Sequence, residues 1–327
     1  MSRHSLATAA AAVATLSVSP FAPILTAPAR AQAGVPIEAA GPEGPLAGTF
    51  IDAGKGAPVA VIIPGSGPTD RDGNSPMGVT AGYLRLLAEG LAGKGVSSVR
   101  IDKRGMFGSR AAVKDPNSAT IAGYAADTGA WIERVRAMTG ASCVWVVGHS
   151  EGALVALAAV GSQAHVCGLV LVAGPGRPLG TIMREQFRAN PANAPYLDSL
   201  NGLLDALEAG RTVPAADLPP VIAPMFPAGV QIYLIDVFRH DPAAMARAYK
   251  GPIMIVRGTR DIQVAQADAD ALRAAAPAAT YLSIDGMNHV LKRVEGDDRA
   301  ANLATYADAS RPLAPGLVDG IAAFIKR

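Results

Sequence analysis

The chain has 327 residues, of which 50% are hydrophobic, 17% are charged and only 5% are aromatic. This length suffices for a sizeable core, and the low charge with a mean hydropathy of +0.25 excludes an intrinsically disordered chain. The formal net charge is +2, and no basic run or stripe supports binding to nucleic acid. Two cysteines exclude a disulfide scaffold, and no cluster of Cys and His suggests a zinc site.

The first 33 residues have the layout of a secretory signal peptide. A short polar start precedes an apolar stretch at 6–18 that is too short to span a bilayer, and an A-x-A cleavage site stands at 31–33. We expect cleavage after Ala33, export to the periplasm or the medium, and a mature chain (34–327) without a membrane anchor. That chain has 27 basic and 27 acidic residues. The alternative for this segment is an Ala-rich disordered tail.

Export places Cys143 and Cys167 in an oxidising compartment. Both cysteines lie near the start of apolar runs. We therefore expect two buried free thiols rather than a bridge.

From residue 34 onward, short apolar runs alternate with helical patterns. Most of the apolar runs are solid rather than alternating, as expected for parallel strands that are buried on both faces. The pattern predicts an α/β fold, a mostly parallel sheet with helices on both faces, with a hairpin (35–39 and 46–51) on its edge. The expected strands are 59–63, 96–101, 143–147, 166–172, 253–256 and 280–284, and the expected helices are 83–91, 121–138, 153–160, 264–275 and 317–325.

Residues 178–250 interrupt this alternation, because they contain many prolines, no good strand pair and leucines at helical spacing. We predict a helical lid inserted into a core domain made of 34–177 and 251–327. Such an insertion often borders the functional site, although an ordinary elaboration without a gating role is the alternative. An apolar group of residues favours an apolar acyl or aromatic substrate group, or else forms the core of the insertion itself: Met225, Phe226, Ile232, Tyr233, Leu234 and Phe238.

The pentapeptide Gly148-His149-Ser150-Glu151-Gly152 lies directly between a predicted strand and a predicted helix. In that context G-x-S-x-G marks a sharp turn that exposes a nucleophilic serine, and its glycines let neighbouring backbone pack closely. The start of the helix places the backbone N–H of Glu151 where an oxyanion would develop. We interpret His149 as a structural neighbour, and the side chain of Glu151 as a local hydrogen-bond partner.

A serine hydroxyl needs a base, and His289 is the candidate because it follows the predicted strand 280–284. The carboxyl ends of parallel strands are where this class of sheet assembles its sites. Two other histidines of the mature chain fit less well. His165 lies at the wrong end of the sheet, and His240 is most simply a surface or capping residue.

The base in turn needs an acid, and Asp261 is the candidate because it follows the predicted strand 253–256. Several other carboxylates compete for this role. We expect Asp285 to be a second neighbour of the histidine, and Asp102 to form structural ion pairs beside Lys103 and Arg104. Two more acids fall on the predicted helix 264–275, where a solvated face is expected: Asp268 and Asp270.

A second oxyanion donor is expected from the loop 64–74, which follows the predicted strand 59–63. The loop is rich in glycine and proline, so its backbone N–H groups can turn toward a ligand. Ser66 is the candidate donor and Gly65 the second choice, while a simple turn is the alternative. No lysine of the Walker type follows, so a phosphate-binding loop is not supported.

From about residue 57 to its end, the chain resembles a bacterial α/β-hydrolase, and it is similar to secreted carboxylesterase-like members near the serine-aminopeptidase-type hydrolases. The chain order Ser150, Asp261, His289 is the order of that fold. The resemblance implies that these residues form a catalytic triad, with a lid from the insertion. It also implies hydrolysis of small carboxylic esters through an acyl-enzyme, with no cofactor and no metal. It rests on five stretches: 64–72, 102–105, 148–152, 258–261 and 286–292.

Two positions depart from the family pattern. Pro64 stands where many relatives have His before the glycine, which concerns the oxyanion loop. Phe107 stands where relatives usually have the second Gly of an R-G-x-G-x-S run. Its larger side chain is expected to reduce the space beside the oxyanion loop.

Three other functions stay open. The first is a peptidase or amidase on the same triad, which needs an acidic site on the insertion, for which Glu185, Asp198 and Glu208 are available. The second is a thioesterase or lactonase, which the triad alone does not distinguish. The third is a non-catalytic binding protein on the same fold.

Overall fold

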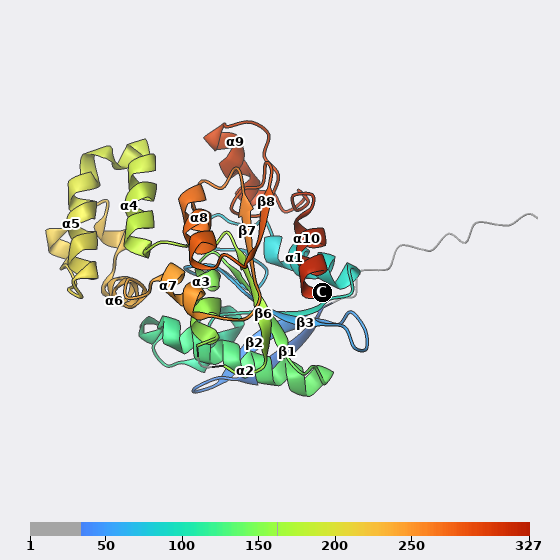
Figure 1. The fold of residues 1–327 in the computed structure, drawn as a ribbon. Coiled ribbons are helices and arrows are strands. Elements are labelled where there is room, and N and C mark those ends of the chain that lie inside the picture. Colours follow the sequence, from blue (N-terminus) through green and yellow to red (C-terminus); the bar gives the residue numbers. More distant parts are fainter. Residues whose placement is uncertain (1–33, 162) are drawn as a thin grey trace, which may run out of the picture. The chain divides into compact units, whose positions relative to one another are not determined.

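A computed structural model of the chain describes residues 34–161 and 163–327, so the predicted signal peptide lies outside the described residues. Within them, eight strands form one sheet in the order β1-β2-β4-β3-β5-β6-β7-β8 (Figure 1). β1 and β2 form an antiparallel hairpin, β2 runs antiparallel to β4, and the other neighbours are parallel. The predicted mostly parallel sheet with an edge hairpin is confirmed. The strands are β1 Val35–Ala40, β2 Pro45–Ile51, β3 Val59–Ile63, β4 Ser97–Ile101, β5 Val144–His149, β6 Val166–Val172, β7 Ile253–Gly258 and β8 Thr280–Ile284.

Helices cover both faces of the sheet, which explains why its central strands are solid apolar runs. On one face Ile62 of β3 shares a core with Leu87 and Ile321, from α1 (Tyr83–Gly93) and α10 (Leu317–Ile325). On the other face Val61 of the same strand shares a core with Trp131. That second face is covered by α2 Ile121–Thr139, α3 Glu151–Ala159 and α8 Gln266–Ala275.

Several elements differ from their predicted bounds by one or two residues, and two of these differences have a clear physical reason. The strand predicted to end at Val147 continues through His149, because His149 still pairs with Val172 of β6. The helix predicted over 264–275 begins at Gln266, because the Asp261 carboxylate accepts hydrogen bonds from the two backbone N–H groups just before it. Those bonds hold the intervening residues in a turn.

The helical insertion (residues 178–250) lies between β6 and β7 and, throughout this fully described stretch, contains helices and no strand. Its helices are α4 Leu179–Ala189, α5 Leu197–Glu208, α6 Ala228–Val237 and α7 Pro242–Ala248. A short α9 (Arg299–Ala304) follows β8. Among the described helices, none is long and apolar enough to cross a membrane. The insertion has a core of its own, made of Leu200, Leu203, Leu207, Leu218, Ile222, Phe226 and Leu234.

Polar contacts of Asp236, Arg177 and Gln186 fasten the insertion to the sheet domain. The Asp236 carboxylate of α6 accepts a hydrogen bond of 2.8 Å from the backbone N–H of Ile121, at the start of α2. The Arg177 guanidinium donates to Glu185 of α4 and to Asp268 of α8. The prediction of a solvated Asp268 is therefore wrong, because its side chain is fully buried and forms an ion pair with Arg177.

Cys143 and Cys167 form a disulfide, with their Cα atoms 5.2 Å apart. The expectation of two free thiols is wrong, because β5 and β6 pair in parallel and bring the two residues side by side where these strands begin. The bridge therefore lies at the opposite end of β5 from Ser150, and it ties two central strands together without bordering the candidate site.

Replacing both cysteines by alanine is expected to lower the free energy of unfolding by about 3 kcal/mol, because the bridge constrains the unfolded chain across a separation of 24 residues. Urea unfolding followed by circular dichroism measures this loss. Wild-type protein unfolded and refolded under reducing conditions serves as the control and should show the same midpoint as the double variant. An unchanged midpoint in the double variant would contradict the assigned bridge.

Candidate active site

Ser150 occupies the sharp turn between β5 and α3. Its φ of 55° and ψ of −124° are a strained conformation for a residue with a side chain. Close backbone packing maintains it: a Cβ atom at Gly148 would lie 2.2 Å from the carbonyl oxygen of Gly152, and one at Gly152 would lie 2.5 Å from that of Ile63. The turn therefore has the strand–turn–helix context in which a G-x-S-x-G motif exposes a nucleophilic serine.

Asp261 and His289 meet at the carboxyl ends of β7 and β8, as their strand-end positions predict. The Asp261 Oδ2 atom lies 2.9 Å from His289 Nδ1, and both side chains are almost fully buried. Asp261 Oδ1 accepts from the backbone N–H groups of Gln263 (2.8 Å) and Val264 (3.0 Å). Burial raises the pKa of Asp261, but His289 and these N–H groups outweigh it and hold the pKa below its usual value. The carboxylate thus stays ionised beside the imidazole.

His149 connects the turn that carries Ser150 to the loop that carries His289. Its Nε2 atom lies 2.8 Å from the carbonyl oxygen of His289, and its Nδ1 atom lies 3.3 Å from the hydroxyl of Tyr83. A carbonyl only accepts, so Nε2 donates and Nδ1 accepts from Tyr83. Burial, together with the neighbouring His289, lowers the pKa of His149 to about 3, which keeps the ring neutral. The sequence predicts that His149 is a structural neighbour, and its contact in that role is the hydrogen bond to the His289 carbonyl.

The contact between the serine turn and His289 is made by His149, the residue before Ser150. Among the described residues, no hydrogen bond joins the Ser150 hydroxyl to the His289 ring. The ring centroids of His149 and His289 are 4.8 Å apart. The turn that carries Ser150 and the loop that carries His289 are therefore in contact. Hydrogen bonds between a nucleophile and its base often tighten only when substrate is bound.

Two buried asparagines, for which the sequence predicts no role, connect the loop that carries Asp261 to the loop that carries His289. Asn288 Nδ2 donates to Asn302 Oδ1 (3.0 Å) and to Thr305 Oγ1 (2.7 Å). Asn302 Nδ2 donates to the carbonyl oxygen of Arg260 (2.7 Å). Since Arg260 precedes Asp261 and Asn288 precedes His289, this network fixes both loops. Asn288 lies within a family-like stretch, but no sequence signal marks Asn302.

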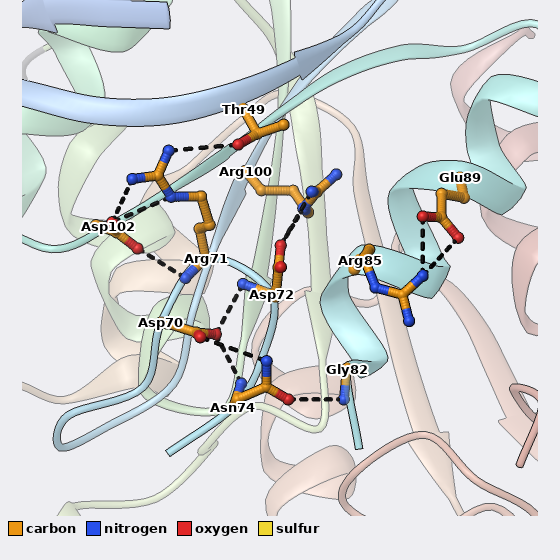
Figure 2. Close-up of polar contacts among 10 residues, drawn as sticks. All are labelled: Thr49, Asp70, Arg71, Asp72, Asn74, Gly82, Arg85, Glu89, Arg100 and Asp102. Carbon is orange, nitrogen blue, oxygen red and sulfur yellow. Dashed lines mark hydrogen bonds and ion pairs between the residues drawn. The ribbon is translucent and has the colours of Figure 1, made fainter. Parts of the chain in front are cut away.

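The loop 64–74 is held by charged contacts to the end of β4 (Figure 2). Asp102 Oδ2 accepts from the Arg71 guanidinium at 2.5 and 3.0 Å, and Asp102 Oδ1 accepts from the Arg71 backbone N–H at 2.8 Å. Asp70 accepts from the backbone N–H groups of Asp72 and Asn74 and closes a turn inside the loop. The predicted structural ion pair of Asp102 is present, with Arg71 as its partner.

The loop 64–74 places its start against the serine turn. A Cβ atom at Gly65 would lie 3.1 Å from the Ser150 Cβ atom. Within the described chain, the backbone N–H groups of Ser66 and Glu151 have no hydrogen-bond partner. Two free donors therefore flank Ser150 in the places predicted for oxyanion donors.

The side chain of Glu151 is not the local partner that was predicted. It is buried, and its Oε1 atom lies 3.4 Å from Nζ of Lys103, 48 residues earlier in the chain. Lys103 Nζ also donates to the carbonyl oxygen of Gly65 at 2.6 Å. Burial lowers the pKa of Lys103, whereas the Glu151 carboxylate acts in the opposite direction.

A cavity of about 420 Å³ opens beside Ser150, between the sheet domain and the helical insertion. Its walls are mainly apolar, and they come from both parts of the chain. His240 is half-buried and borders this cavity, and the cap of α7 is its neighbour Asp241 rather than His240 itself. Apart from His240 the lining includes Ser66, Lys103, Tyr124, Ser150, Glu151, Leu154, Ile182, Met183, Val230, Tyr233, Leu234 and Val264.

Two carboxylates singled out in the sequence, Asp285 and Asp270, have partners other than the Asp261–His289 pair, and Phe107 has an unusual backbone conformation. Asp285 is exposed and accepts from the Thr259 hydroxyl at 3.1 Å, so it is not a neighbour of the His289 ring. Asp270 pairs with Arg273 on the exposed face of α8, as expected. Phe107, which stands where relatives usually have Gly, has a φ of 44°, in the region that favours glycine.

A sheet of this topology, with a serine turn after β5 and an Asp–His pair after β7 and β8, defines the class of α/β-hydrolases. Residues 60–306 match the family model described as Alpha/beta hydrolase family, and the chain belongs to this family. The curated protein Esterase EstD of Thermotoga maritima is 27% identical over 252 residues, which are 73% of this chain and 56% of EstD. The chain thus spans little more than half the length of that relative.

Solved structures share the fold at low identity. The esterase Pf2001 of Pyrococcus furiosus is similar with a TM-score of 0.55 and 17% identity, over 90% of this chain and 92% of that one. A thermophilic esterase of Thermogutta terrifontis is similar with a TM-score of 0.53 and 18% identity, over 90% of this chain and 98% of that one. At such low sequence identity, these similarities show a shared fold and nothing more.

His149 gives a prediction on acid stability. Its pKa is about 3 in the folded chain against 6.5 as the ordinary value, so between these values the unfolded chain binds a proton that the folded chain does not. Stability is therefore present above the ordinary pKa and falls as the pH falls through this window. Gln in place of His149 keeps an N–H donor for the His289 carbonyl but does not titrate.

As the pH falls, we expect the free energy of unfolding to decrease more steeply for wild type than for His149→Gln. The difference between the two slopes should correspond to about one additional proton bound by the unfolded wild-type chain. Urea unfolding from about pH 7 to about pH 4 measures both slopes. Parallel slopes would mean that His149 is not held neutral in the fold.

Proposed function

We propose that the protein is a serine hydrolase that cleaves carboxylic esters through an acyl-enzyme intermediate. Three features of the site support this proposal, and two of them, the serine turn and the free N–H groups, border the apolar cavity. The three features are Ser150 in its strained turn, the Asp261–His289 pair, and the two free N–H groups of Ser66 and Glu151. A nucleophile, a base with its orienting acid, and oxyanion donors are the groups that acyl transfer needs.

In this mechanism, Ser150 Oγ attacks the ester carbonyl while His289 Nε2 takes its proton. The N–H groups of Ser66 and Glu151 bind the oxyanion of the tetrahedral intermediate, and His289 then protonates the leaving alcohol. Water, deprotonated by the same histidine, attacks the acyl-enzyme and releases the acid. Asp261 stays ionised and holds Nδ1–H of His289, so that Nε2 faces the serine.

The relatives support an ester substrate. The curated relative is named an esterase, and two solved structures with this fold are esterases by name. The mainly apolar cavity of about 420 Å³ fits an apolar acyl or aromatic group better than a charged one. The expected substrate is therefore a small ester with an apolar acid part.

The peptidase alternative finds little support in the helical insertion. An acidic site for a substrate amine needs a carboxylate that is not already paired. Glu185 is bound to Arg177 and Glu208 to Arg184, while Asp198 is exposed on α5 and is not part of the cavity lining. A thioesterase or lactonase would use the same groups as an esterase, so substrate assays separate those readings.

We also propose that the protein is exported to the periplasm or the medium. The layout of residues 1–33 motivates this proposal, and the Cys143–Cys167 disulfide supports it, because such bridges persist in oxidising compartments.

Ser150→Ala is expected to lower kcat for p-nitrophenyl esters by about 10⁴-fold or more, because no other group can form the acyl-enzyme. The matched control is Ser98→Ala, which removes a buried hydroxyl without a partner from β4 and should keep both activity and stability. Hydrolysis of esters from acetate to decanoate, with thermal unfolding, measures both variants. Wild-type rates in folded Ser150→Ala would refute the assignment.

Amide and thioester analogues of the best ester separate the remaining alternatives. An esterase should prefer the oxygen ester over the amide by a wide margin. Faster turnover of the thioester or of the amide would move the substrate class, while leaving Ser150 as the nucleophile.

A further inference from the structure

Lys103 takes no part in the steps above, yet its buried ammonium contacts both segments that carry the proposed oxyanion donors. Its Nζ atom lies 2.6 Å from the carbonyl oxygen of Gly65 and 3.4 Å from Oε1 of Glu151. The side chain is 3% exposed and stands just after the end of β4. A buried cation with these two contacts can influence the donors themselves.

The carbonyl of Gly65 and the N–H of Ser66 belong to the same peptide unit. This unit is planar and trans, so its C=O and N–H point in opposite directions. A donor that fixes the carbonyl oxygen therefore also fixes the direction of the N–H group. A cation on that oxygen polarises the amide as well, which makes the N–H a stronger hydrogen-bond donor.

Glu151 supplies the counter-charge from the other side of the site. Its backbone N–H is the second proposed donor, and its carboxylate pairs with the same ammonium. A buried lysine without a partner would be costly, so the ion pair keeps the cation in place. The two donor segments are thus linked through one ammonium group.

Lys103 borders the cavity, but its positive charge is already paired within the protein, which disfavours a role in binding an anionic substrate group. Two of its contacts are the Gly65 carbonyl and the Glu151 carboxylate, and the ammonium also faces the ring of Tyr124 at 5.5 Å from the ring centroid. Two of the three N–H donors of the ammonium make these hydrogen bonds, and its positive charge is paired with the Glu151 carboxylate.

We propose that Lys103 is a positioning residue, which orients and polarises the Gly65–Ser66 peptide so that the Ser66 N–H binds the oxyanion. This inference rests on the proposed function, since it needs an acyl-transfer site at Ser150. It assigns to Lys103 an effect on the tetrahedral intermediate and none on the ground-state complex.

The test compares Lys103→Met with wild type in two kinds of ligand binding. A trifluoromethyl ketone accepts Ser150 Oγ at its carbonyl carbon, and the proton passes to His289, so the adduct carries an oxyanion. The matching secondary alcohol fills the same cavity but forms no oxyanion. We expect the variant to bind the ketone about 10- to 100-fold more weakly, with kcat/KM reduced by a similar factor. Affinity for the alcohol and KM should stay near the wild-type values.

Arg104→Met is the matched control, because it removes the neighbouring cation, which pairs with Asp127 and the Gly123 carbonyl and contacts no donor segment. It should lower the melting temperature but leave the ratio of ketone to alcohol affinity unchanged. If Lys103→Met does not fold, Lys103→Gln replaces it and should show the same selective loss. Equal weakening of ketone and alcohol, or wild-type affinity for the ketone, would overturn the proposal.

The rate at which a fluorophosphonate modifies Ser150 keeps this test separate from the proposed function. Phosphonylation also develops charge on an oxygen in the oxyanion site, whatever the natural substrate is. A wild-type protein that reacts with the probe but hydrolyses no ester would remove the ester assignment. In that case, a slower reaction of Lys103→Met would still support the role of Lys103, and an equal rate would refute it.

Discussion

Three consecutive charged residues, 102–104, directly follow β4, and each has a fixed partner, which the cost of burying charge requires for the buried Asp102 and Lys103. The partners lie on the loop 64–74, on α3 and on α2, so these contacts connect three segments around Ser150. Asp102 fixes the loop 64–74, Lys103 ties the start of that loop to α3, and Arg104 ties the end of β4 to α2. The partners are Arg71, the Gly65 carbonyl, Glu151, Asp127 and the Gly123 carbonyl.

The sheet and the positions of the candidate residues could be predicted from the sequence, because their signals are local. Solid apolar runs mark strands that are buried on both faces, and the serine pentapeptide sits between such a run and a helix. Asp261 and His289 each follow a strand, and parallel strands bring their carboxyl ends to the same edge. The observed contact of 2.9 Å between them follows from topology rather than from their spacing in the chain.

The partners of buried polar groups could not be predicted, because they depend on contacts between distant segments. Glu151 binds Lys103, and Asp268 binds Arg177, although both acids sit in short patterns that favour a local or solvated role. The disulfide was missed for the same reason, since only the parallel register of β5 and β6 brings its two cysteines together. Asn302 links two loops, yet an isolated asparagine gives no sequence signal.

The most direct test of the central claim is to treat the purified full chain with a fluorophosphonate probe and to map the adduct by peptide mass, with ester hydrolysis followed in parallel. The account predicts one adduct, on Ser150, and a loss of ester turnover in proportion to its formation, because Ser150 is the nucleophile. A folded protein that keeps its turnover with Ser150 modified, or that loses it through an adduct on another residue, would contradict the account.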